Sequence, residues 1–240
     1  MPLKKLIKSV LGIKSGAGPS ATKLPKVDVA SLFPARNAAI QMLETATTNG
    51  NATIQEVFTL NFAVAARRPR TVFEIGTFDG RTTVNLAANT PPDTKIFTLD
   101  LPAAGLNQTK FALEDYDRMY VDKPASGTRF KGTEAGVKIT QLLGDSATFD
   151  FSPYFDSIDF VFVDGSHAYE YAFSDSLNAL KLLRKQTGVI LWHDYGHVCW
   201  PGVARALEEL QATHPRFKNL VHIQDTTIAC LLVESNGSKA

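Results

Sequence analysis

The residues with the clearest chemical meaning lie in the run 71–80, where an apolar, β-rich stretch contains Glu74 and ends in two glycines four residues apart, Gly76 and Gly80. A glycine directly after a strand lets the backbone approach a ligand without a Cβ in the way, and a second one lets the next helix start close to the strand. Helical spacing follows at once, since residues 80–89 place Val84 and Ala88 on one face. The run therefore predicts a turn that binds a nucleotide-type cofactor.

The kind of cofactor is narrowed by Phe78, which occupies the place where a dinucleotide fingerprint needs its second glycine. NAD and FAD are therefore disfavoured, and no Gly-x-x-x-x-Gly-Lys-Ser/Thr sequence supports a P-loop. A ligand with a ribose but no phosphate fits better. Asp100 ends the strand expected at 95–100, where its carboxylate can accept hydrogen bonds from both sugar hydroxyls. The alternative is a solvated turn before Pro102.

The elements that must position these residues alternate along the chain between strand and helix, a pattern typical of a doubly wound α/β fold with helices on both faces of a mostly parallel sheet. The last two strands are separated only by a short turn near 224–225, so they predict an antiparallel C-terminal hairpin. The expected strands are 71–76, 95–100, 137–143, 158–163, 188–193, 217–223 and 226–233, and the expected core helices are 80–89, 170–184 and 202–213. A further helix is expected at 110–121, within an insertion at 101–136 whose path the residue pattern does not indicate.

The N-terminal part differs in composition from the rest, because the first 26 residues hold six lysines and no acidic residue. Apolar residues recur at helical spacing from Leu3 to Leu11, which predicts a short cationic amphipathic helix within residues 1–14. Such a helix favours reversible contact with an anionic membrane or a partner protein, and the alternative is a terminus that packs on its own or a second subunit. We expect residues 1–34 to form this segment and a linker.

A single domain is expected over residues 35–240, with two lead-in helices at 35–47 and 53–66 within 35–69, a core at 70–233 and a polar tail at 234–240. A chain of 240 residues, 44% of them hydrophobic, can bury one substantial core. Its two cysteines, Cys199 and Cys230, have no metal-binding spacing and favour a reducing compartment. The net charge of +1 gives no reason to expect a nucleic-acid partner. No run is long and apolar enough for a transmembrane helix.

Two further motifs carry a family resemblance: Asp164-Gly165-Ser166-His167 after the strand at 158–163, and His193-Asp194 after the strand at 188–193. Together with the glycine turn, they make residues 70–233 resemble the class I S-adenosylmethionine-dependent methyltransferases, which have a Rossmann-like sheet. The branch with these two motifs is similar to metal-dependent O-methyltransferases of sugars and natural products. The resemblance implies that this cofactor lies at the carboxyl ends of the strands.

The resemblance also implies which residues contact the cofactor. Asp145 and Ser146 follow the third strand and would lie at the adenine, although both are also strong helix N-caps. Glu74 would receive the ammonium of the ligand indirectly or brace the turn, while Thr77 and Asp79 would contact the methionine portion. The full set of expected cofactor residues is Glu74, Gly76, Thr77, Asp79, Gly80, Asp100, Asp145, Ser146 and Asp164.

Asp164 and Asp194 end strands that are neighbours in this fold, so the resemblance places their carboxylates side by side. Two such acids repel unless a proton or cation lies between them, which predicts a divalent metal, Mg²⁺ or Mn²⁺, at Asp164, His193 and Asp194. His193 stands where several relatives have another acid. Its imidazole either supplies a nitrogen ligand, which shifts the preference toward Mn²⁺, Fe²⁺ or Zn²⁺, or turns away. His167 is the expected general base, and Asp164 the second catalytic residue.

The activity that follows is S-adenosylmethionine-dependent O-methylation of a small molecule or glycan, with a sugar hydroxyl favoured. We expect His197 and Trp200 to border the acceptor pocket, and Tyr169 and Tyr195 either to stack on the acceptor or to pack in the protein. The alternatives are a scaffold protein with this fold, and a nucleotide-binding oxidoreductase, which the missing Tyr-x-x-x-Lys pair disfavours. A cytoplasmic location, with peripheral contact at the inner membrane face, and a homo-oligomer are further expectations.

Overall fold

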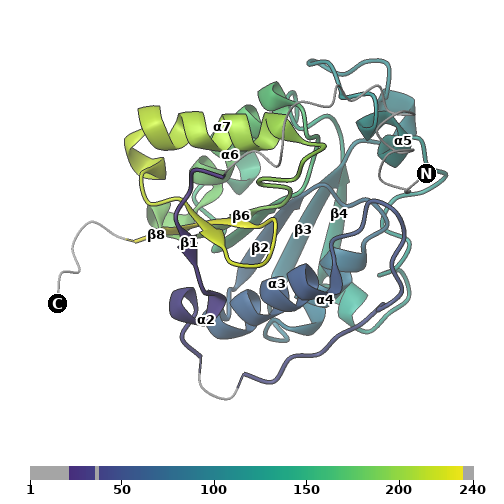
Figure 1. Cartoon of the computed structure of the whole chain (residues 1–240). Coiled ribbons are helices and arrows are strands. Elements are labelled where there is room, and N and C mark those ends of the chain that lie inside the picture. Colours follow the sequence, from purple (N-terminus) through teal and green to yellow (C-terminus); the bar gives the residue numbers. More distant parts are fainter. Residues whose placement is uncertain (1–21, 36–37, 235–240) are drawn as a thin grey trace, which may run out of the picture.

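The computed structural model describes residues 22–35 and 38–234. Over these residues the chain forms one eight-stranded sheet of order β1-β7-β8-β6-β5-β2-β3-β4 (Figure 1). The strands are β1 (Lys26–Val27), β2 (Thr71–Ile75), β3 (Lys95–Asp100), β4 (Ile139–Leu143), β5 (Phe160–Val163), β6 (Gly188–Trp192), β7 (Val221–Ile223) and β8 (Ala229–Val233). Only β8 pairs with its neighbours in the antiparallel sense, so the predicted mostly parallel sheet with an antiparallel C-terminal hairpin is confirmed.

Helices cover both faces of the sheet, with α3 and α4 on one side and α6 and α7 on the other (Figure 1). Side chains alternate along a strand, and this divides the core into two layers. In β5, Phe160 and Phe162 pack on the side of α3 and α4, while Val161 and Val163 pack on the side of α6 and α7. The α-helices are α2 (Val29–Leu32), α3 (Ile54–Arg67), α4 (Arg81–Ala88), α5 (Asp117–Val121), α6 (Tyr169–Leu182) and α7 (Pro201–Thr213), and the 3-10 turns are Ala103–Gly105, Ala135–Lys138, Ser152–Tyr154, Arg184–Gln186 and Pro215–Phe217.

The strand order reverses between β2 and β5, since the chain proceeds from β2 to β3 and β4 in one direction and from β5 to β6 in the other. Gly76 follows β2 and Asp164 follows β5 at this point. The backbone there is so close that a Cβ on Gly76, whose φ is +100°, would lie 1.9 Å from the carbonyl oxygen of Asp164. Gly76 is therefore required by the approach of two strand ends, at the place where open α/β sheets bind ligands.

The lead-in helix expected at 35–47 is wrong, because residues 38–47 form no helix. Two asparagines one helical turn apart on α4 hold this stretch instead. Asn85 accepts from the backbone N–H of Leu43 and donates to its carbonyl, both at 2.9 Å, and Asn89 makes the same two bonds with Gln41 at 2.8 and 2.7 Å. Alternate residues of an extended chain thus match successive turns of a helix. The second lead-in helix is confirmed as α3, which begins with a Thr53–Glu56 capping box.

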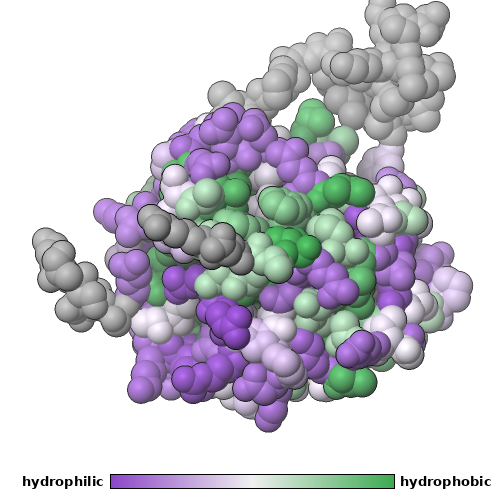
Figure 2. All heavy atoms as spheres, turned by 90° about the horizontal axis from the view of Figure 1, so that it is seen from below, coloured by the Kyte–Doolittle hydropathy of each residue, from purple (hydrophilic) through white to green (hydrophobic). Residues whose placement is uncertain are grey.

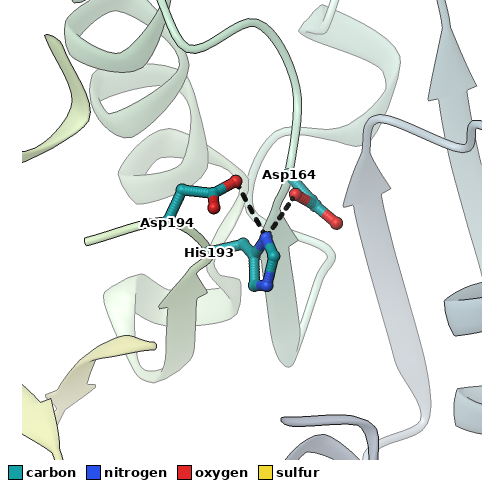
Figure 3. A group of neighbouring side chains, drawn as sticks. All are labelled: Asp164, His193 and Asp194. Carbon is teal, nitrogen blue, oxygen red and sulfur yellow. Dashed lines mark hydrogen bonds and ion pairs between the residues drawn. The ribbon is translucent and has the colours of Figure 1, made fainter. Parts of the chain in front are cut away.

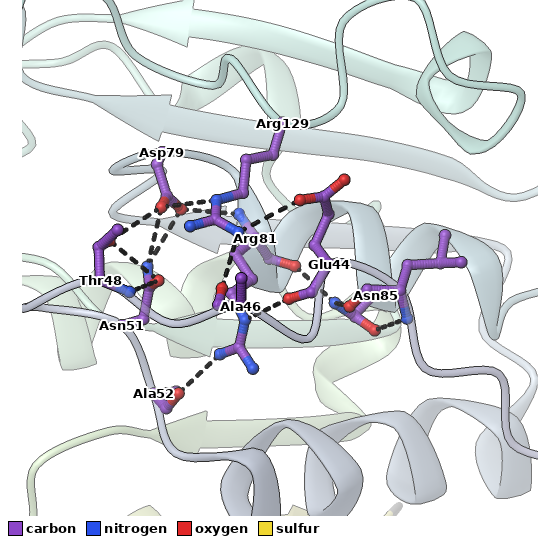
Figure 4. A network of polar contacts seen from close by, with 10 residues as sticks. Glu44, Ala46, Thr48, Asn51, Ala52, Asp79, Arg81, Asn85 and Arg129 are labelled. Atoms are coloured by element: carbon purple, nitrogen blue, oxygen red, sulfur yellow. Dashed lines mark hydrogen bonds and ion pairs between the residues drawn. The ribbon is translucent and has the colours of Figure 1, made fainter.

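A polar network joins residues 44–52 to the turn after β2 and to the start of α4 (Figure 4). The Arg81 guanidinium donates to the carbonyls of Glu44 and Ala52, each at 2.7 Å. Asp79 accepts from Asn51 at 3.1 Å and from Arg129 Nε at 2.8 Å. The carboxylate of Asp79 therefore joins three separate parts of the chain.

Other boundaries differ from expectation in smaller ways. The linker predicted before residue 35 contains β1 and α2, the latter capped by the Asp28 side chain. A helix expected at 110–121 is reduced to α5. The amphipathic segment at 1–14 and the tail at 235–240 lie outside the described residues. Among the helices that are described, none has the length and apolar character needed to cross a bilayer.

An apolar patch lies on the face that carries α3 and α4, seen from below in Figure 2. Ile54 and Phe58 of α3 are 49% and 45% exposed, and the Phe58 ring stacks on Phe62 with centroids 6.4 Å apart. Exposed apolar side chains that gather on one face are typical of protein contact sites. The expected homo-oligomer stays a prediction, for which this face is a candidate.

Candidate functional site

A cavity of about 670 Å³ opens at the carboxyl ends of the central strands, a size suited to a cofactor and a small substrate. It combines most of the expected site residues with side chains of the segment 49–56 and of the insertion 101–136. Its chemically relevant lining comprises Asn49, Gly50, Glu56, Gly76, Phe78, Asp100, Tyr116, Asp117, Tyr120, Lys123, Asp145, Ser146, Asp164, His167, Tyr171, His193, Asp194, His197, Trp200 and Thr227.

At one end of the cavity, Asp100 terminates β3 and is 9% exposed. Its Oδ2 lies 2.8 Å from Nζ of Lys123, which comes from the insertion, and the same ammonium donates to the carbonyl of Tyr120 at 2.7 Å. The Asp100 carboxylate thus stands where the ribose partner was expected, and Lys123 pairs with it in this structure. No sequence motif pointed to Lys123, which lies in the insertion just beyond the helix expected at 110–121.

Asp145 and Ser146 also reach this end, and the alternative that they are helix N-caps is wrong, because no helix begins at residues 146–151. The Asp145 Oδ1 accepts from the backbone of Ala147 at 3.0 Å and from the Tyr171 hydroxyl at 2.9 Å. The Ser146 hydroxyl donates to Oδ2 of Asp175 at 3.2 Å, and Asp175 is a fully buried acid of α6. Burial raises the pKa of Asp175 to about 7. Adenine contact by Asp145 and Ser146 stays a prediction.

Four expected cofactor residues do not line the cavity and instead hold the turn from behind: Glu74, Thr77, Asp79 and Gly80. Glu74 is fully buried, and its Oε2 accepts from the hydroxyls of Thr83 and Thr98 at 2.5 and 2.6 Å. Burial raises its pKa to about 8. Thr77 shares a hydrogen bond with Thr98 at 2.7 Å. Glu74 therefore braces the turn, which is the second of its two expected roles.

Gly80 is the N-cap of α4 in a left-handed conformation, with φ of +86°. A Cβ at this position would lie 2.6 Å from the Phe130 ring. The glycine therefore accommodates the insertion as well as the start of the helix, and the insertion is packed directly against the cofactor turn.

At the other end of the cavity, Asp164, His193 and Asp194 form the expected cluster (Figure 3). One ligand atom from each lies within 4.8 Å of the others. The His193 Nδ1 is 3.1 Å from Asp164 Oδ1 and 2.9 Å from Asp194 Oδ2. Although burial alone lowers the pKa of His193, the two carboxylates raise it well above its usual value. Two oxygen donors and one nitrogen donor fit a divalent transition ion such as Mn²⁺.

Glu56 of α3 completes the cluster and was not expected. Its Oε2 lies 3.2 Å from His193 Nε2, and its Oε1 accepts from the backbone and hydroxyl of Thr227 at 2.9 and 2.7 Å. Despite the opposing effect of burial, His193 and Thr227 hold the pKa of Glu56 below its usual range. The Thr53-x-x-Glu56 spacing indicates a capping box, but only the folded chain brings this carboxylate to the histidine.

His167 lies beside the cluster, with Nε2 2.8 Å from Asp194 Oδ2 and Nδ1 paired with Asp117 Oδ1. Its ring stacks on Trp200 at a centroid distance of 3.9 Å. Burial alone lowers its pKa, but hydrogen bonds and charges from Asp117 and Asp194 raise the pKa to about 9. Both ring nitrogens are thus engaged in this structure, so an acceptor hydroxyl would have to replace the contact with Asp194.

Aromatic side chains form the wall above this cluster. Tyr120 packs edge-on against both Phe78 and Trp200, at 5.7 and 6.5 Å between centroids, and Tyr116 packs against Trp200 at 6.1 Å. His197 and Trp200 line the cavity, and their contact with an acceptor stays a prediction.

Tyr169 and Tyr195 do not line the cavity, so stacking of either on an acceptor is wrong. The Tyr169 hydroxyl donates to Glu209 at 2.9 Å, and the Arg205 guanidinium lies 4.1 Å from its ring centroid. Tyr195 is fully buried, and its hydroxyl accepts from the backbone of Leu24 at 3.0 Å. Both tyrosines therefore pack in the protein, which was the second of their two expected roles.

A sequence model of the methyltransferase domain family matches residues 73–195 of this chain. No curated protein sequence matches it. An O-methyltransferase of Bacillus cereus in complex with SAH is 16% identical, with a TM-score of 0.53 and coverage of 96% of this chain and 97% of that one. TomG of Streptomyces achromogenes, an O-methyltransferase involved in tomaymycin synthesis and solved with SAM, is 18% identical, with a TM-score of 0.51 and coverage of 98% and 100%.

The SAH-bound methyltransferase PaMTH1 of Podospora anserina is 16% identical, with a TM-score of 0.56 and coverage of 98% of each chain. At these identities the structural likeness establishes the fold. The family match spans just over half of the chain, from inside β2 to the residue after Asp194, and so includes both motifs of the site. The chain therefore belongs to the methyltransferase domain family, and it has the Rossmann-like fold of the class I methyltransferases.

Proposed function

We propose that the protein transfers the methyl group of S-adenosylmethionine to a hydroxyl oxygen of a small molecule or glycan. The observation that carries the proposal is one cavity with two chemically different ends. Asp100 provides a carboxylate for ribose hydroxyls at one end, and Asp164, His193 and Asp194 gather oxygen and nitrogen donors at the other. Methyl transfer from a sulfonium is an in-line displacement, so placing both reactants in one cavity supplies much of the catalysis.

A divalent metal is part of the proposal, because the donor set at Asp164, His193 and Asp194 fits one. The contact of Glu56 with the second nitrogen of His193 is the kind of partner that fixes the orientation of a metal-binding imidazole. When bound, such an ion lowers the pKa of the acceptor hydroxyl and stabilises the alkoxide. Asp164, His193 and Asp194 would hold the ion, while Glu56 and His167 orient or move protons beside it.

A sugar hydroxyl is the favoured acceptor. Tyr116 and Tyr120, which pack against the buried Trp200, place aromatic side chains next to the carboxylates, and such side chains suit the face of a sugar or aromatic ring. The O-methyltransferases among the solved structures with this fold support transfer to oxygen.

The test uses the full chain with methyl-labelled S-adenosylmethionine and a panel of monosaccharides, glycosides and catechols, with Mn²⁺, with Mg²⁺ or with EDTA. The expected result is label on an oxygen of one acceptor class, with loss of transfer in EDTA and recovery on adding metal. Methyl transfer at the same rate with and without EDTA would contradict the metal assignment. Methyl transfer to nitrogen or carbon would contradict the assignment as an O-methyltransferase.

Substitution of the cluster tests the metal separately from turnover. Asp164→Asn and Asp194→Asn should each weaken Mn²⁺ binding by at least about tenfold, since each removes an anionic ligand. Asp115→Asn, an exposed acid on the insertion, is the matched control and should bind Mn²⁺ like the wild type. Equal Mn²⁺ affinity in all four proteins, measured by calorimetry, would contradict the assignment.

A further inference from the structure

The insertion between β3 and β4 contains a carboxylate that the proposed function has not used. Asp117 is the first residue of α5 and is only 3% exposed, whereas the adjacent Tyr116, Arg118 and Met119 are exposed. A carboxylate is rarely buried in this way unless its oxygens are paired.

Each of the hydrogen-bond partners that the structure gives the Asp117 carboxylate comes from the motif after β5. Its Oδ2 accepts from the Ser166 hydroxyl at 2.5 Å and from the backbone N–H of His167 at 3.0 Å. Its Oδ1 pairs with Nδ1 of the His167 ring. One carboxylate from the insertion therefore fixes both the backbone and the side chain of the expected general base.

Together with the Asp117 pair, the other contacts of His167 leave its ring a single orientation. Nε2 is directed at Asp194 Oδ2, 2.8 Å away, and one ring face lies on Trp200. Turning the ring to exchange its two nitrogens would break the pair with Asp117. The orientation of Nε2 toward the Asp194 edge therefore depends on where the insertion lies.

We propose that Asp117 is a positioning residue, which couples the placement of the insertion over the cavity to the orientation of His167. With the insertion in place, Asp117 holds Nδ1 and leaves Nε2 directed at the Asp194 edge, where the acceptor hydroxyl would lie. When Asp117 is withdrawn, the ring loses the contact that fixes Nδ1 and keeps only those with Asp194 and Trp200 among the contacts described above. The catalytic consequence rests on the proposed function, but the hold on the ring does not.

The test follows the His167 ring and amide by NMR in the full, SAH-loaded chain. Asp117→Asn keeps one oxygen that can accept from Ser166 and the His167 backbone, but loses the carboxylate oxygen that pairs with Nδ1. It should shift the ring-nitrogen resonances of His167 and leave those of the distant His214 unchanged. Asp117→Ala should in addition speed hydrogen exchange at the His167 amide by about tenfold or more, because that N–H loses its charged acceptor.

Asp115→Asn is the matched control, because it makes the same change of charge on an exposed acid of the same insertion and should leave the His167 signals as in the wild type. Wild-type ring resonances in Asp117→Asn would overturn the inference. If Asp117→Ala does not fold, the ring resonances of Asp117→Asn alone test the inference. Thermal unfolding of Asp117→Asn is measured as well, to show that this variant is folded.

Kinetics with an acceptor found in the transfer assay separate this inference from the proposed function. Asp117→Asn should lower kcat by at least about tenfold, as expected when a histidine loses the carboxylate that orients it, while the dissociation constant for SAH stays within about threefold. If the wild type methylates no acceptor in the transfer assay, the proposed function is refuted, but the NMR measurement still tests whether Asp117 orients His167. Full turnover by Asp117→Asn would refute the positioning role.

Discussion

Single residues at this site serve the protein's own structure as much as a ligand. Gly76 was predicted because a ligand must approach the backbone, and the structure adds that the carbonyl of Asp164 already lies where a Cβ would be. The motif and the position could be predicted from sequence. The reason for the glycine could not, because it depends on the pairing of β2 with β5, strands that are far apart in the chain.

Gly76→Ala should lower the free energy of unfolding by more than about 2 kcal/mol, because a left-handed φ and a collision with backbone act together. Gly132→Ala is the matched control, since Gly132 also has a positive φ, +75°, but a Cβ there would have no neighbour within 4 Å. It should cost only about 1 kcal/mol. Equal losses in urea unfolding would show that the β2–β5 approach is looser than described.

Glu74 makes stability depend on pH. Its pKa in the folded protein is about 8, above its ordinary value of 4.5, so the unfolded chain releases the proton first as the pH rises. The free energy of unfolding should therefore fall between about pH 4.5 and 8, by at most about 1.4 kcal/mol per pH unit. Glu74→Gln should reduce this fall, whereas the exposed Glu114→Gln should leave it unchanged. Parallel urea-unfolding curves for Glu74→Gln and wild type from pH 5 to 8 would contradict the account.

Among the elements, regular strands and helices were predictable and irregular ones were not. The apolar runs at β2, β3, β5 and β6 predicted the ends of these strands to within a few residues, because strands buried on both faces are apolar along most of their length. The stretch 38–47 was mistaken for a helix because its extended form depends on side chains of α4, which no local pattern reveals. The insertion was left without a path for the same reason, and with it Asp117, Tyr120 and Lys123 were missed.

Lys123 predicts an effect of the insertion on cofactor affinity. Its ammonium pairs with Asp100 at 2.8 Å, so ribose hydroxyls would have to displace it. Lys123→Met should therefore bind SAH more tightly, by about threefold or more, since each 1.4 kcal/mol of relieved competition is a factor of ten. Lys131→Met, an exposed lysine of the same insertion, should bind like the wild type. Weaker binding by Lys123→Met would mean that the lysine itself holds the cofactor.

For the whole molecule, the sheet order explains why one cavity can serve both reactants. The reversal between β2 and β5 brings the end of β3, with Asp100, and the ends of β5 and β6, with Asp164 and Asp194, around a single opening. The insertion and the segment 49–56 close that opening from two sides. Family and fold follow from this frame, whereas the acceptor depends on the irregular segments around it.

The measurement that tests the central claim most directly is a calorimetric titration of SAH into the full chain and into Asp100→Asn. The account predicts a micromolar dissociation constant or tighter for the wild type, equivalent to about 8 kcal/mol, and at least about tenfold weaker binding for Asp100→Asn. No heat from the folded wild type, or equal affinities in the two proteins, would contradict a cofactor site at the switch between β2 and β5.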